Sequence, residues 1–317
     1  MAAAPALGCR VKLLALALAL TGSLHAATYY VTVAGLGGAP DYESVFEKWA
    51  GDLQKELAKN GVADNENVLL RGSAATRAAL EQALTRIASE MKPDDEFALF
   101  LIGHGTFDGT DYKFNLPGPD ISAAELARAL DRIPAKRQLV VNMSSASGAS
   151  LTALAHKGRI LIAATKSGTE RNATVFPRYW IDGLRDPAAD MDKNGVVTTL
   201  ELFRYTTQKT AAYFEQEKLL ATEHAMLIDS GTNAVRDPKP ENGQGLLAAR
   251  FAILEPAGET ARNLAPEKQR LVAKKEDLEA QIDRLKYAKA AMAPDEYKQQ
   301  LTALLLELAR TQAEIDK

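Results

Sequence analysis

The sequence predicts an α/β fold with a mainly parallel sheet, followed by a C-terminal αα-hairpin. Two observations predict the first part: apolar strand-like segments alternate with amphipathic helical segments, and most strand-like segments are apolar at nearly every position. Strands that are apolar on both faces are typical of a parallel sheet covered on both sides by helices, which gives three layers. Apolar residues at heptad spacing near the C-terminus predict the hairpin.

The strand-like segments end in turn signals. The first begins at Thr28 and ends in glycines, and the third and fourth end at Gly105 and Gly148. Glycine at these points allows the chain to turn sharply. In chain order, the strands are expected over residues 28–38, 67–72, 95–105, 137–148 and 159–168.

Three helices are expected between these strands, over residues 41–61, 73–91 and 121–133. The first places Phe46, Trp49 and Leu53 on one face and stops at Gly61. The second starts with either Ser73 or Thr76 as its N-cap. In the third, Ser122 and Glu125 have the spacing of a capping box.

The C-terminal part of the chain has a different pattern. Residues 230–262 are rich in Gly, Pro, Asn and Asp and predict a connector, in which residues 246–254 could form an edge strand. In residues 263–317 apolar side chains recur on two helical segments separated by Pro294. The two stripes are Leu271, Leu278, Leu285 and Met292, then Tyr297, Leu301, Leu304, Leu308 and Ile315. The hairpin packs on itself or on the main domain, or it forms a short coiled coil in an oligomer or with a partner.

The composition excludes some classes of protein. The 317 residues are 46% hydrophobic and 25% charged, as in an ordinary soluble globular protein. Lys and Arg number 38 against 41 Asp and Glu, so the net charge is −3. Because this leaves no basic excess to hold a phosphate backbone, we expect no nucleic-acid partner.

The N-terminal segment, residues 1–26, has the layout of a secretory signal peptide. Arg10 and Lys12 precede an apolar run over residues 13–20, and small residues follow up to Ala26. This run is too short for a membrane anchor. We therefore expect an exported protein, periplasmic or secreted, with no membrane association after cleavage. The only cysteine, Cys9, would leave with the signal.

Two strand ends carry side chains suited to chemistry. The third strand runs into His104-Gly105, and the fourth runs into Ser144, Ser145 and Gly148. The carboxyl ends of parallel strands are where ligands bind in open α/β sheets. A histidine and a serine on neighbouring strand tips could act as base and nucleophile. Polar residues nearby, to which no role is assigned, are Asp108, Asp111, Asn142, Lys166, Ser167, Glu170 and Arg171. His156 and His224 are expected to be structural.

This order of elements and motifs resembles the caspase-like fold of the legumain-type cysteine peptidases and their bacterial relatives. The resemblance covers the chain from Thr28 to Asp229, and we place this domain at residues 27–229. The family has a His-Gly motif after the third strand, which His104-Gly105 matches. It has Ala-Cys-X-Ser-Gly after the fourth strand, where this chain has Ser145 at the cysteine position, or Ser144 if the frame is shifted by one.

The resemblance implies a peptidase, but the serine departs from the family pattern. A thiol ionises easily, whereas a serine hydroxyl needs a base within hydrogen-bonding reach. We therefore expect a catalytically silent or impaired homologue that binds a peptide or protein at the place where the family has its catalytic site. One alternative is an active hydrolase that uses Ser145 with His104. Another is a structural interaction protein that works through the C-terminal helices.

The most specific motif is a calcium loop at residues 190–201. Its twelve positions match the EF-hand pattern, with the sharp turn at Gly195. The expected ligands are Asp190, Asp192, Asn194, the carbonyl of Val196, Thr198 and Glu201. We expect a single bound Ca²⁺ with a structural role. The alternative is an acidic turn without metal.

Overall fold

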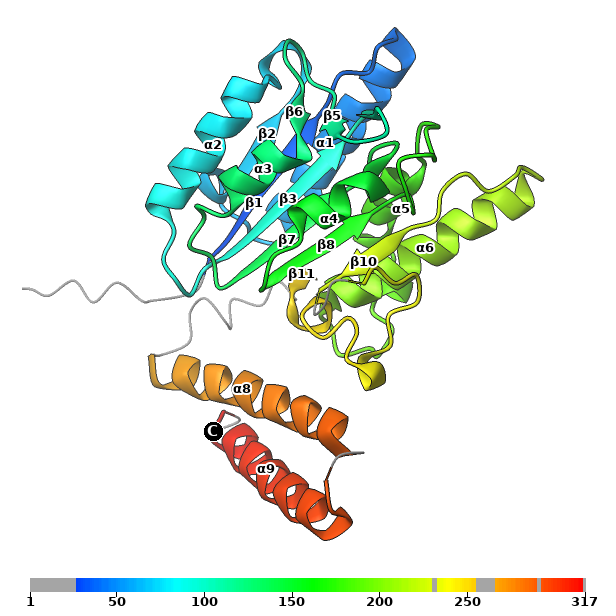
Figure 1. Ribbon diagram of the computed structural model, residues 1–317. Coiled ribbons are helices and arrows are strands. Elements are labelled where there is room, and N and C mark those ends of the chain that lie inside the picture. The colour runs from blue at the N-terminus through cyan, green and yellow to red at the C-terminus, as the bar shows by residue number, and fades with distance from the viewer. Residues whose placement is uncertain (1–26, 230–232, 255–265, 290–291, 316–317) are drawn as a thin grey trace, which may run out of the picture.

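The computed structural model describes residues 27–229, 233–254, 266–289 and 292–315. Its centre is a six-stranded sheet in the order β10-β8-β7-β3-β1-β2 (Figure 1). The strands are β1 (Thr28–Ala34), β2 (Asn67–Leu70), β3 (Glu96–Ile102), β7 (Arg137–Asn142), β8 (Arg159–Ala163) and β10 (Met226–Ile228). All neighbouring pairs are parallel except β8 with β10. The predicted α/β fold with a mainly parallel sheet is thus confirmed.

Helices cover both faces of this sheet (Figure 1). On one face α1 (Pro40–Lys59), α5 (Phe176–Gly183) and α6 (Thr199–Gln216) bury a core around Phe100 and Trp180. On the other face α2 (Arg77–Glu90), α3 (Ala123–Leu130) and α4 (Leu151–Leu154) bury a second core around Leu99 and Val140. Alternate residues of each strand therefore enter opposite cores, which is why the strands are apolar throughout.

Helix caps explain where two of the predicted helices begin. The Thr76 hydroxyl accepts a hydrogen bond from the Ala79 N–H, so Thr76 and not Ser73 caps α2. The capping box of Ser122 and Glu125 is present at α3. That helix is shorter than the predicted 121–133 because Ile121–Ser122 pair with another strand as β6.

A small antiparallel sheet at the carboxyl edge of the main sheet was not predicted. It consists of β4 (Gly105–Phe107), β5 (Tyr112–Phe114) and β6 (Ile121–Ser122) in that order. β4 follows His104 directly, so the chain after β3 turns into this sheet. The small sheet therefore sets the surroundings of the His104-Gly105 motif.

Residues 233–254 return to the main domain. Val235 bridges to Leu227 of β10, and Phe251 is fully buried in the core beside α6. The predicted edge strand over 246–254 is reduced to β11 (Ala252–Leu254). It pairs with β9 (Val197–Thr198) and not with the main sheet, since Ala248–Arg250 form a short 3-10 helix, η6. The other 3-10 turns of the described residues are η1 (Asp64–Glu66), η2 (Gly72–Ala74), η3 (Ser147–Ser150), η4 (Pro187–Ala189) and η5 (Pro240–Asn242).

The predicted C-terminal hairpin is formed by α8 (Pro266–Ala288) and α9 (Pro294–Ile315), which pack against each other (Figure 1). Leu278, Ile282 and Leu285 of α8 are buried, and Lys274 pairs with Glu307 of α9 at 3.0 Å. Among the described residues, no helix is long and apolar enough to cross a membrane. The expected signal peptide, residues 1–26, lies outside the described residues.

Candidate functional site

The two sequence motifs meet at the carboxyl edge of the sheet. β3 and β7 are parallel neighbours, with Leu101 paired to Asn142. His104 follows β3 by two residues, and Ser144 and Ser145 follow β7. Parallel pairing with this register explains why residues forty positions apart in the chain come together.

The Ser145 hydroxyl is bound to the backbone of Gly105. Its Oγ accepts a hydrogen bond from the Gly105 N–H at 3.1 Å and donates one to the Gly105 carbonyl at 3.1 Å. A side chain on residue 105 would lie 2.5 Å from the Ser145 carbonyl oxygen and 2.5 Å from the Tyr112 ring. Glycine is therefore needed at 105 for this close approach. Only 2% of Ser145 is exposed.

Ser144 belongs to a separate buried network. Its Oγ lies 2.7 Å from the Tyr112 hydroxyl and donates to Asn142 Oδ1 at 2.8 Å. The Asn142 side chain in turn donates to Ser150 Oγ at 3.1 Å. Burial raises the pKa of Tyr112 to about 12, so this phenol stays protonated. Ser144 is fully buried, and its hydroxyl stabilises the turn.

The turn after Ser145 is strained. Ala146 has φ 55° and ψ 12°, the left-handed region that residues with a side chain seldom adopt. Its N–H donates to the Glu170 carbonyl at 2.7 Å, which links the turn to the loop after β8. Strain of this kind costs about 1–3 kcal/mol and persists at functional sites.

The His104 ring takes its partners from the β1–α1 connection and α1. Its ring packs edge-on against Tyr42 and Phe46, with centroids 4.9 and 5.0 Å away, and hydrogen-bonds to the backbone of Gly37. Within the described part of the chain, the His104 ring makes no hydrogen bond to Ser144 or Ser145. Burial holds the pKa of His104 below its usual value, and the Gly37 bond offsets this partly.

Exposed apolar side chains occur on the segment whose Tyr42 contacts the His104 ring. Leu36, Tyr42 and Val45 are 40%, 44% and 37% exposed, and Tyr42 contacts the His104 ring. They belong to the β1–α1 connection and the first turns of α1. We refer to these three residues as the apolar rim. Large exposed apolar side chains that gather at one place mark interaction sites more often than scattered ones do.

The other polar residues near the strand ends take local roles. Asp108 caps the turn after β4 by accepting hydrogen bonds from the Thr110 and Asp111 N–H groups. Arg171 donates to the carbonyl oxygens of Phe107 and Gly168. Among the histidines, His156 is exposed and its ring bonds the Lys157 carbonyl.

Two buried residues near this edge, Tyr112 and Glu223, have no recognisable signal in the sequence. Tyr112 lies on a three-residue strand and Glu223 just before β10, in segments without strong periodicity. An isolated glutamate such as Glu223 forms no motif, and the sequence alone assigns no role to Glu170, whose charge acts on it.

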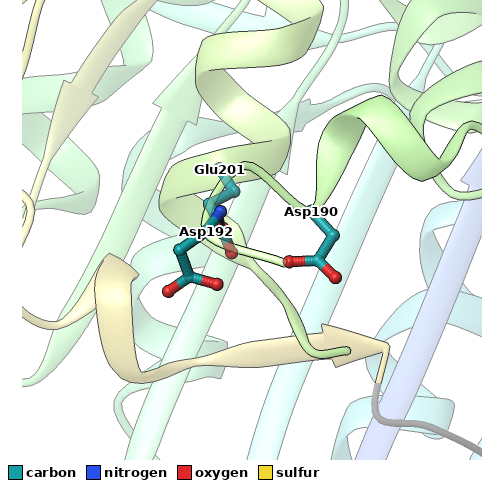
Figure 2. A group of neighbouring side chains, drawn as sticks. All are labelled: Asp190, Asp192 and Glu201. Atoms are coloured by element: carbon teal, nitrogen blue, oxygen red, sulfur yellow. Dashed lines mark hydrogen bonds between the residues drawn. The ribbon is translucent and has the colours of Figure 1, made fainter. Parts of the chain in front are cut away.

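The loop over residues 190–201 forms a second candidate site. Figure 2 shows the carboxylates of Asp190, Asp192 and Glu201 close together at the start of α6. One ligand oxygen from each lies within 4.8 Å of the others. Two oxygens that share a Ca²⁺ at 2.3–2.6 Å are at most about 5 Å apart, so the three carboxylates fit one ion.

Backbone hydrogen bonds hold this loop in a turn. Asp190 accepts from the Asn194 and Gly195 N–H groups at 3.1 and 2.9 Å, and Gly195 has φ 86°. Glu201 accepts from the Met191 N–H at 3.0 Å and caps α6 together with Thr198. The loop therefore has the closed shape that calcium binding needs, and β9 within it is tied to β11.

Solved structures similar to this chain include protein GSU0716 from Geobacter sulfurreducens. The match covers 72% of this chain and 100% of that chain, with 14% sequence identity and a TM-score of 0.47. They also include the Drosophila initiator caspase Dronc, at 9% identity and a TM-score of 0.42 over 71% of this chain and 84% of that chain. No protein-family model and no curated protein matches the chain. The fold class therefore rests on the strand order and the layers described above.

Proposed function

We propose that the chain is an exported bacterial homologue of the legumain- and caspase-like peptidases that lacks peptidase activity and binds a peptide or protein at the carboxyl edge of its sheet. The observation that carries this proposal is the Ser145 hydroxyl, whose proton and lone pair are both engaged by Gly105. A serine becomes a nucleophile only when a base takes its proton. Here the proton is directed at a backbone carbonyl.

The position of His104 supports the same conclusion. Its ring is engaged by Gly37 and enclosed by two aromatic side chains, so it neither receives the Ser145 proton nor orients that hydroxyl. Because no cysteine follows Cys9 in the sequence, no thiolate can replace the serine. Both features support a site that keeps the place of the family's catalytic residues without an activated nucleophile.

The apolar rim is the binding surface in this proposal. A peptide laid along the carboxyl edge beside His104 would cover Leu36, Tyr42 and Val45, removing apolar area from water. Aromatic side chains such as Tyr42 are favoured at binding surfaces because they offer a large, rigid contact area. Binding here requires no chemistry from Ser145.

The test combines hydrolysis and binding on one peptide library. We expect no cleavage of quenched peptides by the protein above the level of its Ser145→Ala and His104→Ala variants. We expect the protein to bind peptides, and we expect this binding to persist in Ser145→Ala and to be lost in Tyr42→Glu. Leu220 lies outside the apolar rim and is 87% exposed, so Leu220→Glu is the control and should leave peptide binding unchanged. Cleavage that disappears in both Ser145→Ala and His104→Ala would overturn the proposal and favour the serine hydrolase.

We further propose that the loop 190–201 binds one Ca²⁺ in a structural role. The ion would take its ligands from Asp190, Asp192, Asn194, the Val196 carbonyl, Thr198 and Glu201. Three mutually close carboxylates favour a divalent cation over an empty turn, because without a cation they repel one another. The loop leads into α6, and its strand β9 pairs with β11, so bound calcium would brace this corner of the domain.

A second candidate function is partner binding or oligomerisation through the hairpin. On α9, Leu305 and Leu306 are 48% and 55% exposed although this helix packs against α8. A helix that is apolar on two sides can pack against a second surface as well as α8. Partner binding that is lost in Leu306→Glu and retained in Tyr42→Glu would favour binding through the hairpin over binding at the apolar rim.

A further inference from the structure

Ala27 follows the expected signal peptide directly, and the start of β3 holds both of its backbone groups. Its N–H donates to Asp95 Oδ1 at 2.8 Å, and its carbonyl accepts the Glu96 N–H at 2.8 Å. Its side chain packs against the second core, and at the next residue β1 begins, where Thr28 pairs with Glu96. Residue 27 is therefore a fixed part of the fold.

Asp95 is a buried carboxylate that its own turn holds in position. Only 3% of this residue is exposed. Its Oδ2 accepts the Lys92 N–H at 2.7 Å, and its own N–H donates to the Lys92 carbonyl at 3.0 Å, which closes the turn before β3. The Asp95 carbonyl accepts the Lys136 N–H at 2.7 Å, just before β7. With Oδ2 and the backbone engaged in this way, Oδ1 is directed at the nitrogen of Ala27.

The hydrogen bonds of Asp95 do not balance its charge. Both of its oxygens accept from backbone N–H groups, which are neutral. Across the described ranges of the chain, no lysine, arginine or histidine side chain pairs with Asp95, and the neighbouring Glu96 pairs with Arg137. Buried carboxylates are generally paired with an opposite charge, because loss of water disfavours an isolated one. A cation at the nitrogen of Ala27 would supply that charge.

Removal of the expected signal peptide creates such a cation. Hydrolysis of the bond between Ala26 and Ala27 adds the hydroxyl of water to the Ala26 carbonyl carbon and a proton to the Ala27 nitrogen. The amide thus becomes an amine, which takes up a further proton at neutral pH because an α-amino group has an ordinary pKa of about 8. The nitrogen that gains this charge is the one 2.8 Å from Asp95 Oδ1.

We propose that the α-ammonium group of Ala27, freed when the signal peptide is removed, forms a buried ion pair with Asp95 that fixes the start of β1 in the mature protein. The pair cannot form in the precursor, where this nitrogen is an uncharged amide, so it stabilises the mature fold alone. The proposal rests on the proposed function only in treating the chain as exported and cut after Ala26. It requires no binding at the apolar rim.

The charges around the start of β1 favour a cation there. Burial raises the pKa of Tyr29, two residues further along β1, and negative charges nearby raise it further. These charges are the carboxylates of Asp95, Glu66 and Glu90. Arg86 opposes them but is itself paired with Glu90 at 2.7 Å. Because an opposite charge favours the charged form of a group, the α-ammonium should keep its proton to higher pH than a free N-terminus does.

The first measurement is the mass of the exported protein. The full-length chain is expressed in a bacterium, recovered after export and measured intact by mass spectrometry. We expect the mass of residues 27–317. A mature chain with another first residue would overturn the ion pair alone, whereas a chain that keeps residues 1–26 would also contradict the export in the proposed function.

The reactivity of the α-amino group then tests the contact with Asp95. The mature protein is treated with an acetylating reagent at pH 8, and modification of its N-terminal peptide is followed by mass spectrometry. We expect wild type to react about five-fold more slowly than Asp95→Asn, or more slowly still, because a protonated amine does not react. Asp94→Asn removes a charge from an exposed residue of the same turn, so it is the matched control and should react at the wild-type rate.

A second comparison leaves Asp95 in place, so it does not depend on how well Asp95→Asn folds. A chain of residues 26–317 carries its ammonium group one residue earlier and restores the amide at Ala27. At pH 7 we expect it to melt about 2–4 °C below the chain of residues 27–317, and we expect this difference to disappear in the Asp95→Asn background.

Equal melting temperatures of these two chains with Asp95 intact would overturn the ion pair. Equal acetylation rates of wild type and Asp95→Asn would overturn it as well. Neither result bears on peptide binding by the apolar rim, so failure of the ion pair and failure of the proposed function are distinguishable.

Discussion

The ring of His104 is held in surroundings that favour its neutral form. Because burial lowers its pKa in the folded protein, the unfolded chain takes up a proton first as the pH falls below 6.5. The stability that His104 contributes is therefore present above pH 6.5 and is lost as the pH falls through the lower pKa of the folded state. In urea unfolding, we expect the advantage of wild type over His104→Gln to shrink between pH 8 and pH 5.5. An advantage that is the same at both pH values would contradict this.

Replacement of glycine by alanine should have opposite effects on stability at Gly105 and at Gly51. Gly105→Ala places a methyl group 2.5 Å from Ser145 and Tyr112, which should cost about 1–3 kcal/mol in the free energy of unfolding. Gly51→Ala, within α1, meets only the end of Arg71 at 3.6 Å. It should stabilise the protein by about 0.5–1 kcal/mol through helix propensity. A denaturation midpoint of Gly105→Ala that does not fall below that of wild type would show that Gly105 is not closely packed.

The sequence could place His104, Ser144 and Ser145 on neighbouring strand ends, because apolar strands and glycine turns mark those ends. It could not show which atoms these side chains bond. The partners of Ser145 lie on Gly105, and those of His104 on Tyr42 and Gly37, contacts set by how separate segments pack. The hydrogen bonds that support the proposal of a silent serine are thus tertiary, and no local pattern encodes them.

At the scale of elements, we expect substitutions in the loop 190–201 to have two separable effects on the melting temperature. Added Ca²⁺ should raise the melting temperature of wild type, by the equivalent of about 2.7 kcal/mol at a concentration 100-fold above Kd. Asp192→Asn should weaken that response with little change in the metal-free protein. Glu201→Ala should also lower the metal-free melting temperature, because it removes the N3 side chain of the capping box at α6, a contribution of about 1 kcal/mol.

Thermal unfolding in chelator, then with Ca²⁺ or Mg²⁺, measures both effects. Mg²⁺ is the control, because it prefers fewer protein ligands and tighter octahedral geometry. Equal melting temperatures with chelator and with millimolar Ca²⁺ would argue that the loop is an acidic turn without metal.

Long elements were predictable from sequence and short ones were not. β1, β3 and β7 were recognised because each carries at least six mostly apolar residues, and α8 and α9 because their heptads extend over several turns. β4, β5 and β10 have three residues each, too few to show a period. β10 forms because its residues complete the open edge of β8, which only the assembled sheet presents.

At the scale of the molecule, the main domain extends to Leu254. Phe251 and Ala248 are fully buried in its core, and the Asp229 carboxylate accepts the Gly245, Leu247 and Ala248 N–H groups. No described residue of α8 or α9 belongs to either core. A chain that ends at Leu254 should therefore keep its melting temperature within a few degrees.

Ending the chain at Asp229 should instead destabilise the domain by at least about 3 kcal/mol, the cost of removing one buried Phe side chain. Circular dichroism of both shortened chains checks this. If both melted like the full chain, the packing of residues 233–254 would contribute nothing to stability. The longer form is also the right one for separating binding by the domain from binding by the hairpin.

The strand order has a consequence for assembly during synthesis. The five parallel strands are complete once the chain has reached Ala163, whereas β10 begins at Met226. A nascent chain that folds from its N-terminus would pass through a stage in which β8 is the open edge of the sheet, its backbone groups available to another chain. The arrival of β10 ends that exposure. Variants that weaken β10 should thus increase aggregation of newly made protein before they affect the finished domain.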